Sequence, residues 1–116
     1  MIRAELAGEV APNMVTEHIV LVLAFGDYEV RYGNEISDRG TFALDATTSQ
    51  CSLTLTGVEG TNAARTIPCL FQLAGDRLRV CFGLDGELPV DFTTSPDSRR
   101  YLATYRRISG NKVDRP

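Results

Sequence analysis

The sequence predicts a single all-β domain, an antiparallel up-and-down meander barrel of about eight strands. Short apolar or alternating segments recur at intervals of roughly 8 to 12 residues, and turn-forming residues separate them. Helical patterning is confined to one turn at Pro12–His18. Sequential hairpins without long crossovers favour a barrel over a two-sheet sandwich, the other architecture that such strands allow.

The chain length bounds the organisation of the protein. Its 116 residues suit one domain, which we place at residues 1–108, followed by a flexible C-terminal tail at 109–116. The longest apolar run, Ile19–Phe25, is far shorter than the roughly 20 residues of a membrane span. The N-terminal segment has no apolar stretch of the kind that a secretory signal needs, so we expect a cytoplasmic protein without membrane contact unless residues precede Met1.

The first four strands are predicted from apolar runs and two-residue alternation. Ile19–Phe25 is apolar throughout and typical of a buried strand. Tyr28–Tyr32 alternates, with its two tyrosines and Val30 on one face. Gly40–Leu44 and Cys51–Thr56 follow, and each has its large apolar residues two positions apart.

The last four strands follow a predicted loop at Gly57–Arg65. Thr66–Leu73 and Arg77–Phe82 form a hairpin. Leu88–Phe92 is a short strand at an edge or a strand start, because its proline cannot donate to a ladder. Tyr101–Ile108 is the final strand.

The register of the 66–82 hairpin is predicted from burial. A two-residue turn at 75–76 pairs Phe71 with Val80 and gathers the large apolar residues on one face. A three-residue turn would pair Phe71 with Arg79 and bury a guanidinium group, so we expect the first register. It also places Cys69 and Cys81 on opposite faces, which excludes a disulfide between them.

No motif for catalysis or metal binding is present. The three cysteines lack C-x-x-C spacing and His18 is the only histidine, so we expect free, mostly buried thiols, no metal, no cofactor and no enzymatic activity. His18 is interpreted as a surface or capping residue. Six acidic residues are interpreted as solvated turn acids: Glu29, Glu35, Asp38, Asp85, Glu87 and Asp91.

The net charge of −3 is unevenly distributed. Residues 99–116 hold six basic residues and one acid, which is +5, so the first 98 residues carry −8. A basic end can dock on nucleic acid, but the acidic body repels phosphate and no aromatic stacking motif accompanies the arginines. We therefore expect no nucleic-acid partner.

These segments, in this order and spacing, resemble a family of small, functionally uncharacterised lipocalin-like proteins abundant in planctomycetes. The resemblance covers about Ala4 to Arg107 and is most specific at Gly75–Phe82. The other segments that carry it are Phe25–Val30, Gly40–Asp45, Leu53–Thr56, Glu59-Gly60, Leu88–Phe92 and a closing strand that ends in Arg107. The resemblance implies a calycin-type barrel and no activity, because the family offers no established substrate or catalytic residue.

The chain departs from the family pattern at its start. Family members usually open with a strand that carries a Gly-x-Trp element, whereas this chain has no tryptophan, so the first strand is expected to be shortened or missing. In lipocalin-like barrels that strand pairs with the last one, and its tryptophan commonly packs on a basic residue of the last strand. The corresponding residue here, Arg107, is expected to lack that partner. Open barrel edges invite pairing with another chain, so we expect a homodimer. Leu88-Pro89 also replaces the usual Arg-Pro pair.

The barrel interior is the candidate binding site. An eight-stranded barrel is just wide enough to be filled by its own side chains or to hold one small ligand. Seven aromatic rings among the inward residues slightly favour a filled interior over a cavity. The residues that alternation points inward are Tyr28, Tyr32, Phe42, Leu53, Leu55, Phe71, Val80, Phe82, Phe92 and Tyr105.

Two functions follow from these alternatives. The leading one is binding of a small hydrophobic molecule with a polar or anionic end inside the barrel. The other is a structural or interaction module, a homodimer through open barrel edges with a filled interior and no ligand. The predicted ligand-contacting residues are Tyr28, Tyr32, Phe42, Phe71, Phe82, Tyr105 and Arg107.

Overall fold

The computed structural model describes residues 1–6, 8–45, 51–95 and 99–107, and its architecture is almost entirely antiparallel β, as predicted. One four-residue helix, α1 (Asn13–Thr16), begins after Pro12 within the predicted helical turn. The strands are β1 (Arg3–Leu6), β2 (Glu9–Val10), β3 (Ile19–Ala24), β4 (Asp27–Tyr32), β5 (Glu35–Asp45), β6 (Cys51–Gly60), β7 (Thr66–Ala74), β8 (Arg77–Gly83) and β9 (Arg100–Arg106). The predicted tail at 109–116 lies outside the described residues.

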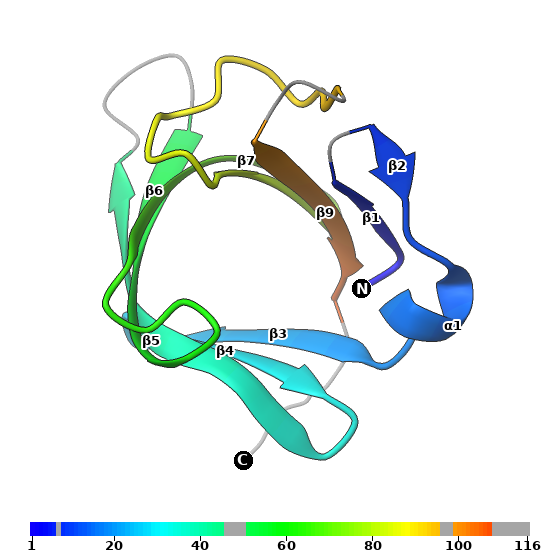
Figure 1. The fold of residues 1–116 in the computed structure, drawn as a ribbon, viewed down its shortest axis with the longest axis horizontal. Coiled ribbons are helices and arrows are strands. Elements are labelled where there is room, and N and C mark those ends of the chain that lie inside the picture. The colour runs from blue at the N-terminus through cyan, green and yellow to red at the C-terminus, as the bar shows by residue number, and fades with distance from the viewer. Residues whose placement is uncertain (7, 46–50, 96–98, 108–116) are drawn as a thin grey trace.

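The nine strands form one sheet that curls around a central space (Figure 1). From β3 to β9 each strand pairs with the next along the chain, so the up-and-down order is confirmed. β1 then pairs with β9, and β2 with β1, which leaves β2 and β3 as the two ends of a curled half-barrel. The ammonium group of Met1, just before β1, donates a hydrogen bond to the carbonyl of Ile19 at the start of β3, at 2.7 Å.

The predicted register of the β7–β8 hairpin is confirmed. Phe71 pairs with Val80, and Gln72 lies opposite Arg79, whose guanidinium donates to the Gln72 side chain at 2.7 Å. Cys69 and Cys81 are buried free thiols in different apolar clusters on opposite faces. The register therefore followed from the rule that a one-residue slip would have buried arginine.

Several strand boundaries differ from the prediction. β1 exists, although it has four residues, and pairs with β9 over its whole length without a tryptophan. The unpredicted β2 forms because Gly8, at φ +87°, turns the chain back on β1. β5 begins at Glu35 and β6 continues to Gly60, so the predicted loop from residue 57 was too long.

The predicted strand Leu88–Phe92 is wrong. The segment belongs to the loop between β8 and β9, where the Asp91 carboxylate accepts hydrogen bonds from Thr93 and Arg100 instead of the backbone joining a ladder. Phe92 points outward, not inward: it packs on the convex face with Leu70, Cys81 and Leu102. The large apolar residues of the β7–β8 hairpin are therefore not all on one face, since Leu70 lies beneath this loop.

In the described part of the chain, α1 is too short to cross a membrane, and no other helix is present that could. Along the chain, α1 lies between β2 and β3, close to the start of β3 (Figure 1).

Candidate functional site

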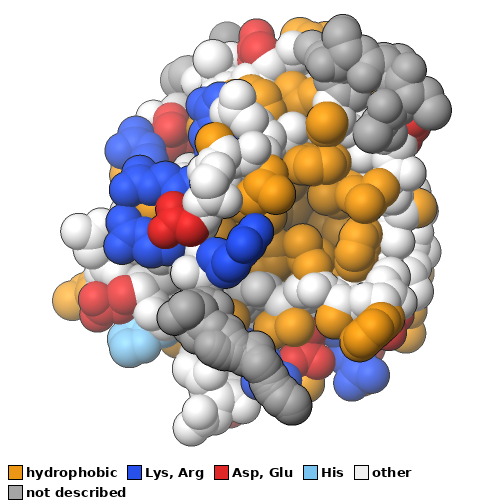
Figure 2. Space-filling view, turned by 180° about the vertical axis from the view of Figure 1, so that it is seen from behind, with side chains coloured by type: hydrophobic (Ala, Val, Ile, Leu, Met, Phe, Trp, Pro, Cys, Tyr) orange, Lys and Arg blue, Asp and Glu red, His pale blue; other side chains and the backbone are white. Residues whose placement is uncertain are grey.

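The concave face of the sheet carries the larger of the two apolar clusters of the described residues, and strand alternation points every second residue toward it. Figure 2 shows this face as a hollow lined by hydrophobic side chains, with Arg side chains beside one part of its rim. We call the following residues the concave cluster: buried Tyr28, Leu53, Leu55, Ile67, Cys69, Val80, Phe82, Ala103 and Tyr105, and partly buried Met1, Leu21, Val30, Phe42, Phe71, Leu78, Leu84 and Tyr101.

The structure brings five of the seven predicted site residues into this cluster. Three of them are buried and two, Phe42 and Phe71, are partly buried against the others. Tyr32 shares the inward face of β4 but lies at the end of the strand, where it is half-exposed and contacts the ring of His18 at 5.8 Å between centroids. Arg107 follows β9 and is exposed.

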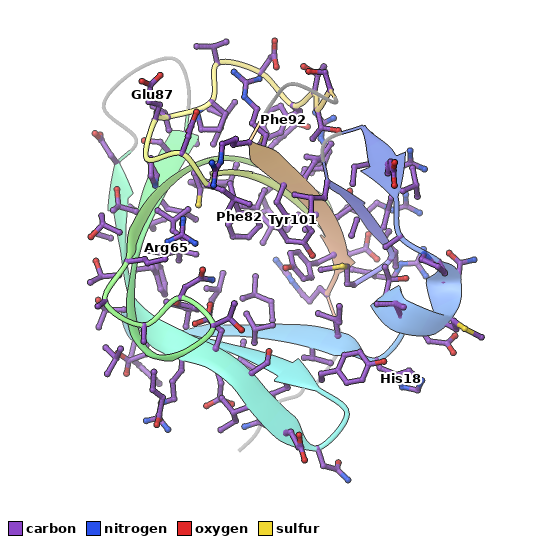
Figure 3. All side chains as sticks on the ribbon, viewed as in Figure 1. His18, Arg65, Phe82, Glu87, Phe92 and Tyr101 are labelled. Atoms are coloured by element: carbon purple, nitrogen blue, oxygen red, sulfur yellow. The ribbon has the colours of Figure 1, made fainter. Side chains whose placement is uncertain are left out.

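A pair of aromatic rings lines the hollow near β8 and β9. Phe82 and Tyr101 stack with centroids 5.2 Å apart, and Figure 3 shows both inside the curl, whereas Phe92 lies on its outer side. The Tyr101 hydroxyl lies 3.6 Å from the sulfur of Met1. Met1 therefore contacts both Ile19 at the start of β3 and Tyr101 of the aromatic pair.

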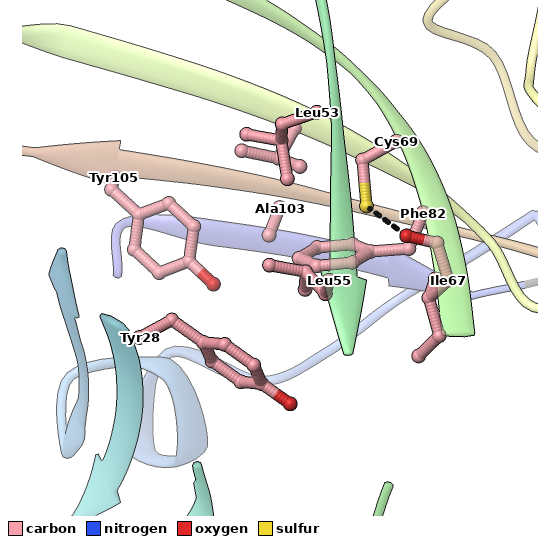
Figure 4. Packing of buried hydrophobic residues seen from close by; sticks show 9 residues of the cluster. Tyr28, Leu53, Leu55, Ile67, Cys69, Phe82, Ala103 and Tyr105 are labelled. Carbon is pink, nitrogen blue, oxygen red and sulfur yellow. Dashed lines mark hydrogen bonds between the residues drawn. The ribbon is translucent and has the colours of Figure 1, made fainter. Parts of the chain in front are cut away.

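Tyr105 places a polar group in the middle of the apolar cluster. Its side chain is 7% exposed, and its hydroxyl points inward among the buried side chains (Figure 4). Within residues 1–6, 8–45, 51–95 and 99–107, this hydroxyl has no hydrogen-bond partner. Burial raises the pKa of the Tyr105 phenol, so it remains a proton donor at neutral pH.

Arg107 continues the face on which Tyr105 lies. Its backbone N–H donates to the carbonyl of Asp76 at 2.7 Å, which extends the β8–β9 ladder beyond Arg106. Two-residue alternation therefore puts the Arg107 side chain on the concave side, at the end of β9. Among the described residues its guanidinium makes no ion pair.

A second polar group on the concave side is a buried carboxylate that sequence reasoning missed. Asp38 is 5% exposed and accepts hydrogen bonds from the Tyr28 hydroxyl at 3.2 Å, from the Asn62 side chain at 2.8 Å and from the Asn62 backbone at 3.2 Å. The interpretation of Asp38 as a solvated turn acid is wrong. Burial, together with the nearby Asp38 carboxylate, raises the pKa of Tyr28 to about 12.

Local backbone geometry positions this carboxylate. A β-bulge shifts the register of β4 and β5, so that Asp38 pairs with Val30 and Ile36 with Arg31, with Ser37 between them. On the other side Asp38 faces Gly60, whose φ is +96° and where a Cβ would meet the carbonyl oxygen of Ser37 at 2.3 Å. Glycine is required there because any side chain would push the 60–62 turn away from Asp38.

The histidine and the three cysteines are the remaining chemical candidates. His18 is exposed and 3.9 Å from the Glu17 carboxylate, and Figure 3 shows it outside the curl. Cys51 is exposed, whereas burial raises the pKa of the Cys69 and Cys81 thiols. In the described ranges, no three His, Cys, Asp or Glu side chains come together as metal ligands would.

Comparison with known proteins adds no relative to this picture. No family model matches the chain, and neither a curated protein nor a solved structure matches it. What this site can do must therefore follow from the residues that line it.

Proposed function

We propose that the protein is a small-ligand carrier of lipocalin-like type whose concave face binds one small, mainly apolar molecule carrying a hydrogen-bond acceptor at one end. The observation that carries the proposal is the buried Tyr105 hydroxyl without a partner among the described residues. A buried polar group left without a hydrogen bond costs about 1–3 kcal/mol, so such groups usually meet a ligand or a water molecule.

The surroundings of Tyr105 define the class of ligand. Aromatic and aliphatic side chains of the concave cluster surround its ring, so the body of the ligand is apolar. Arg107 lies two residues further along the same face and has no ion-pair partner in the described residues. A carboxylate would accept from the Tyr105 hydroxyl and face the Arg107 guanidinium, so an anionic head suits this end of the site best.

The Tyr28–Asp38–Asn62 group helps to shape the binding site but is not expected to hydrogen-bond to the ligand. Both carboxylate oxygens of Asp38 are already occupied by protein donors, and the Tyr28 hydroxyl is committed to one of them. We therefore propose that Tyr105, and not Tyr28, is the tyrosine that orients the ligand.

Fluorescence titration with anilinonaphthalene sulfonate, followed by displacement with decanoate, tests this function. We expect saturable binding of the probe and its displacement by decanoate. Tyr105→Phe should weaken decanoate binding roughly tenfold or more, because it removes a hydrogen bond to a charged group. It should leave the melting temperature unchanged or higher, because it also removes a buried polar group that has no partner in the described part of the chain.

Tyr32→Phe is the matched control, since its hydroxyl belongs to a half-exposed side chain at the end of β4. It should bind decanoate as the wild type does. Absence of saturable binding, or equal decanoate affinity in the Tyr105→Phe and wild-type proteins, would overturn the proposed role of the hollow.

A further inference from the structure

One edge of β3 has no neighbouring strand in the described part of the chain, and it is the less protected of the two sheet edges. The Gly33 N–H donates a hydrogen bond to the His18 carbonyl, so His18 directs its backbone toward β4. Because every second residue of an antiparallel strand does the same, Val20, Val22 and Ala24 also direct their N–H and C=O groups toward β4. The N–H and C=O groups of Leu21 and Leu23 therefore point away from β4. No backbone partner for them is found in the described ranges of the chain.

The two ends of the sheet differ in how they are protected. β2 has two residues, one of them the charged Glu9, and Pro12 follows shortly after it, which are common ways of blocking an edge. β3 has six residues without a charge, a proline or a bulge, and its side chains are apolar on both faces. Such an edge is a template for pairing with another strand.

Exposed apolar side chains at both ends of β3 indicate what pairs there. Phe25, in the turn to β4, is fully exposed and has φ +55°, a left-handed conformation that is strained for a bulky residue. At the other end of β3, α1 exposes Met14 and Val15. An antiparallel second copy would bring the Phe25 end of one chain to the α1 end of the other.

We infer that the chain forms a two-fold homodimer by antiparallel pairing of β3 with β3 of a second copy. Leu21 of each chain exchanges backbone hydrogen bonds with Leu23 of the other, and the symmetry axis passes at Val22. This register pairs Leu21 and Leu23, whose backbone groups have no partner among the described residues, and it keeps the hydrogen bond between Met1 and Ile19. It places valine or alanine opposite valine on the convex face, with no charge within the paired strands.

Light scattering coupled to size-exclusion chromatography of the wild-type chain and two lysine variants tests the dimer. At micromolar concentration the wild type should have twice the mass of one chain. Val22→Lys, at a partly exposed position on the axis, should raise the dimer dissociation constant at least tenfold, because two ammonium groups would then lie opposite each other. Val10→Lys makes the same change on the other edge strand, and should leave the dimer intact.

Amide hydrogen exchange on the wild type locates the interface even if Val22→Lys fails to fold. The amides of Leu21 and Leu23 should become protected as concentration rises through the monomer–dimer transition. A monomeric wild type overturns the inference. So does a dimer in which these two amides exchange rapidly, or in which Val10→Lys dissociates the protein as strongly as Val22→Lys.

Discussion

Replacing Asp38 with alanine is expected to lower the free energy of unfolding by about 3 kcal/mol. The substitution removes the acceptor of three hydrogen bonds and leaves the Tyr28 hydroxyl and two N–H groups of Asn62 without a partner. It also releases the 60–62 turn from β5, so the loss should be accompanied by faster exchange of the Asn62 amide. Urea denaturation followed by far-UV circular dichroism measures the change.

Two variants calibrate that result. Glu35→Ala removes an exposed carboxylate from the same strand and should change stability by about 0.5 kcal/mol or less. Asp38→Asn keeps the size of the side chain and one acceptor oxygen, so it should fall between the two. If Asp38→Ala lowers the free energy of unfolding no more than Glu35→Ala does, Asp38 is not the buried, hydrogen-bonded carboxylate that the structure places beside Tyr28.

Phe82→Ala should have the largest effect of any single truncation in the concave cluster, about 3–5 kcal/mol. Phe82 is 9% exposed, its ring stacks on Tyr101, and it is one of the buried residues of the cluster. Its removal leaves a cavity between β8 and β9 that the sheet backbone cannot close. The midpoint of urea denaturation, with an unchanged slope, gives the difference in stability.

Leu73→Ala is the matched control for Phe82. Leu73 pairs with Leu78 in the same hairpin, but 57% of its side chain is exposed at the rim of the concave face. Its truncation should cost less than about 1 kcal/mol, because little apolar area leaves water on folding there. If both variants lose the same free energy of unfolding, Phe82 is buried no more deeply in the concave face than Leu73 is at its rim.

Strand order and register could be predicted from the sequence wherever the two-residue period was strict. The β7–β8 hairpin is the clearest case, because one of its two registers would have buried Arg79. The period misled at Leu88–Phe92, where side-chain hydrogen bonds of Asp91 hold a loop and Phe92 turns to the convex face. β2 carries no signal of its own, since two residues cannot show a period.

The candidate site could be predicted in part. Alternation along β4 and β9 placed Tyr28 and Tyr105 inward. It did not reveal that the first hydroxyl is hydrogen-bonded, whereas the second has no partner among the described residues. Asp38 was missed because its residue type favours solvent. The available signal was its position: counting back in twos from Phe42 on β5 puts Asp38 on the inward face.

The rate at which Cys69 reacts with a thiol reagent tests the burial of the concave cluster most directly. Cys69 is 0% exposed, and its thiol donates to the Ile67 carbonyl at 3.5 Å, whereas Cys51 is exposed. In a Cys51→Ser, Cys81→Ser protein, Cys69 should react orders of magnitude more slowly in buffer than in urea, at a rate set by opening of the fold. Reaction of Cys69 in buffer as fast as that of Cys51 in the wild type would contradict a buried concave cluster.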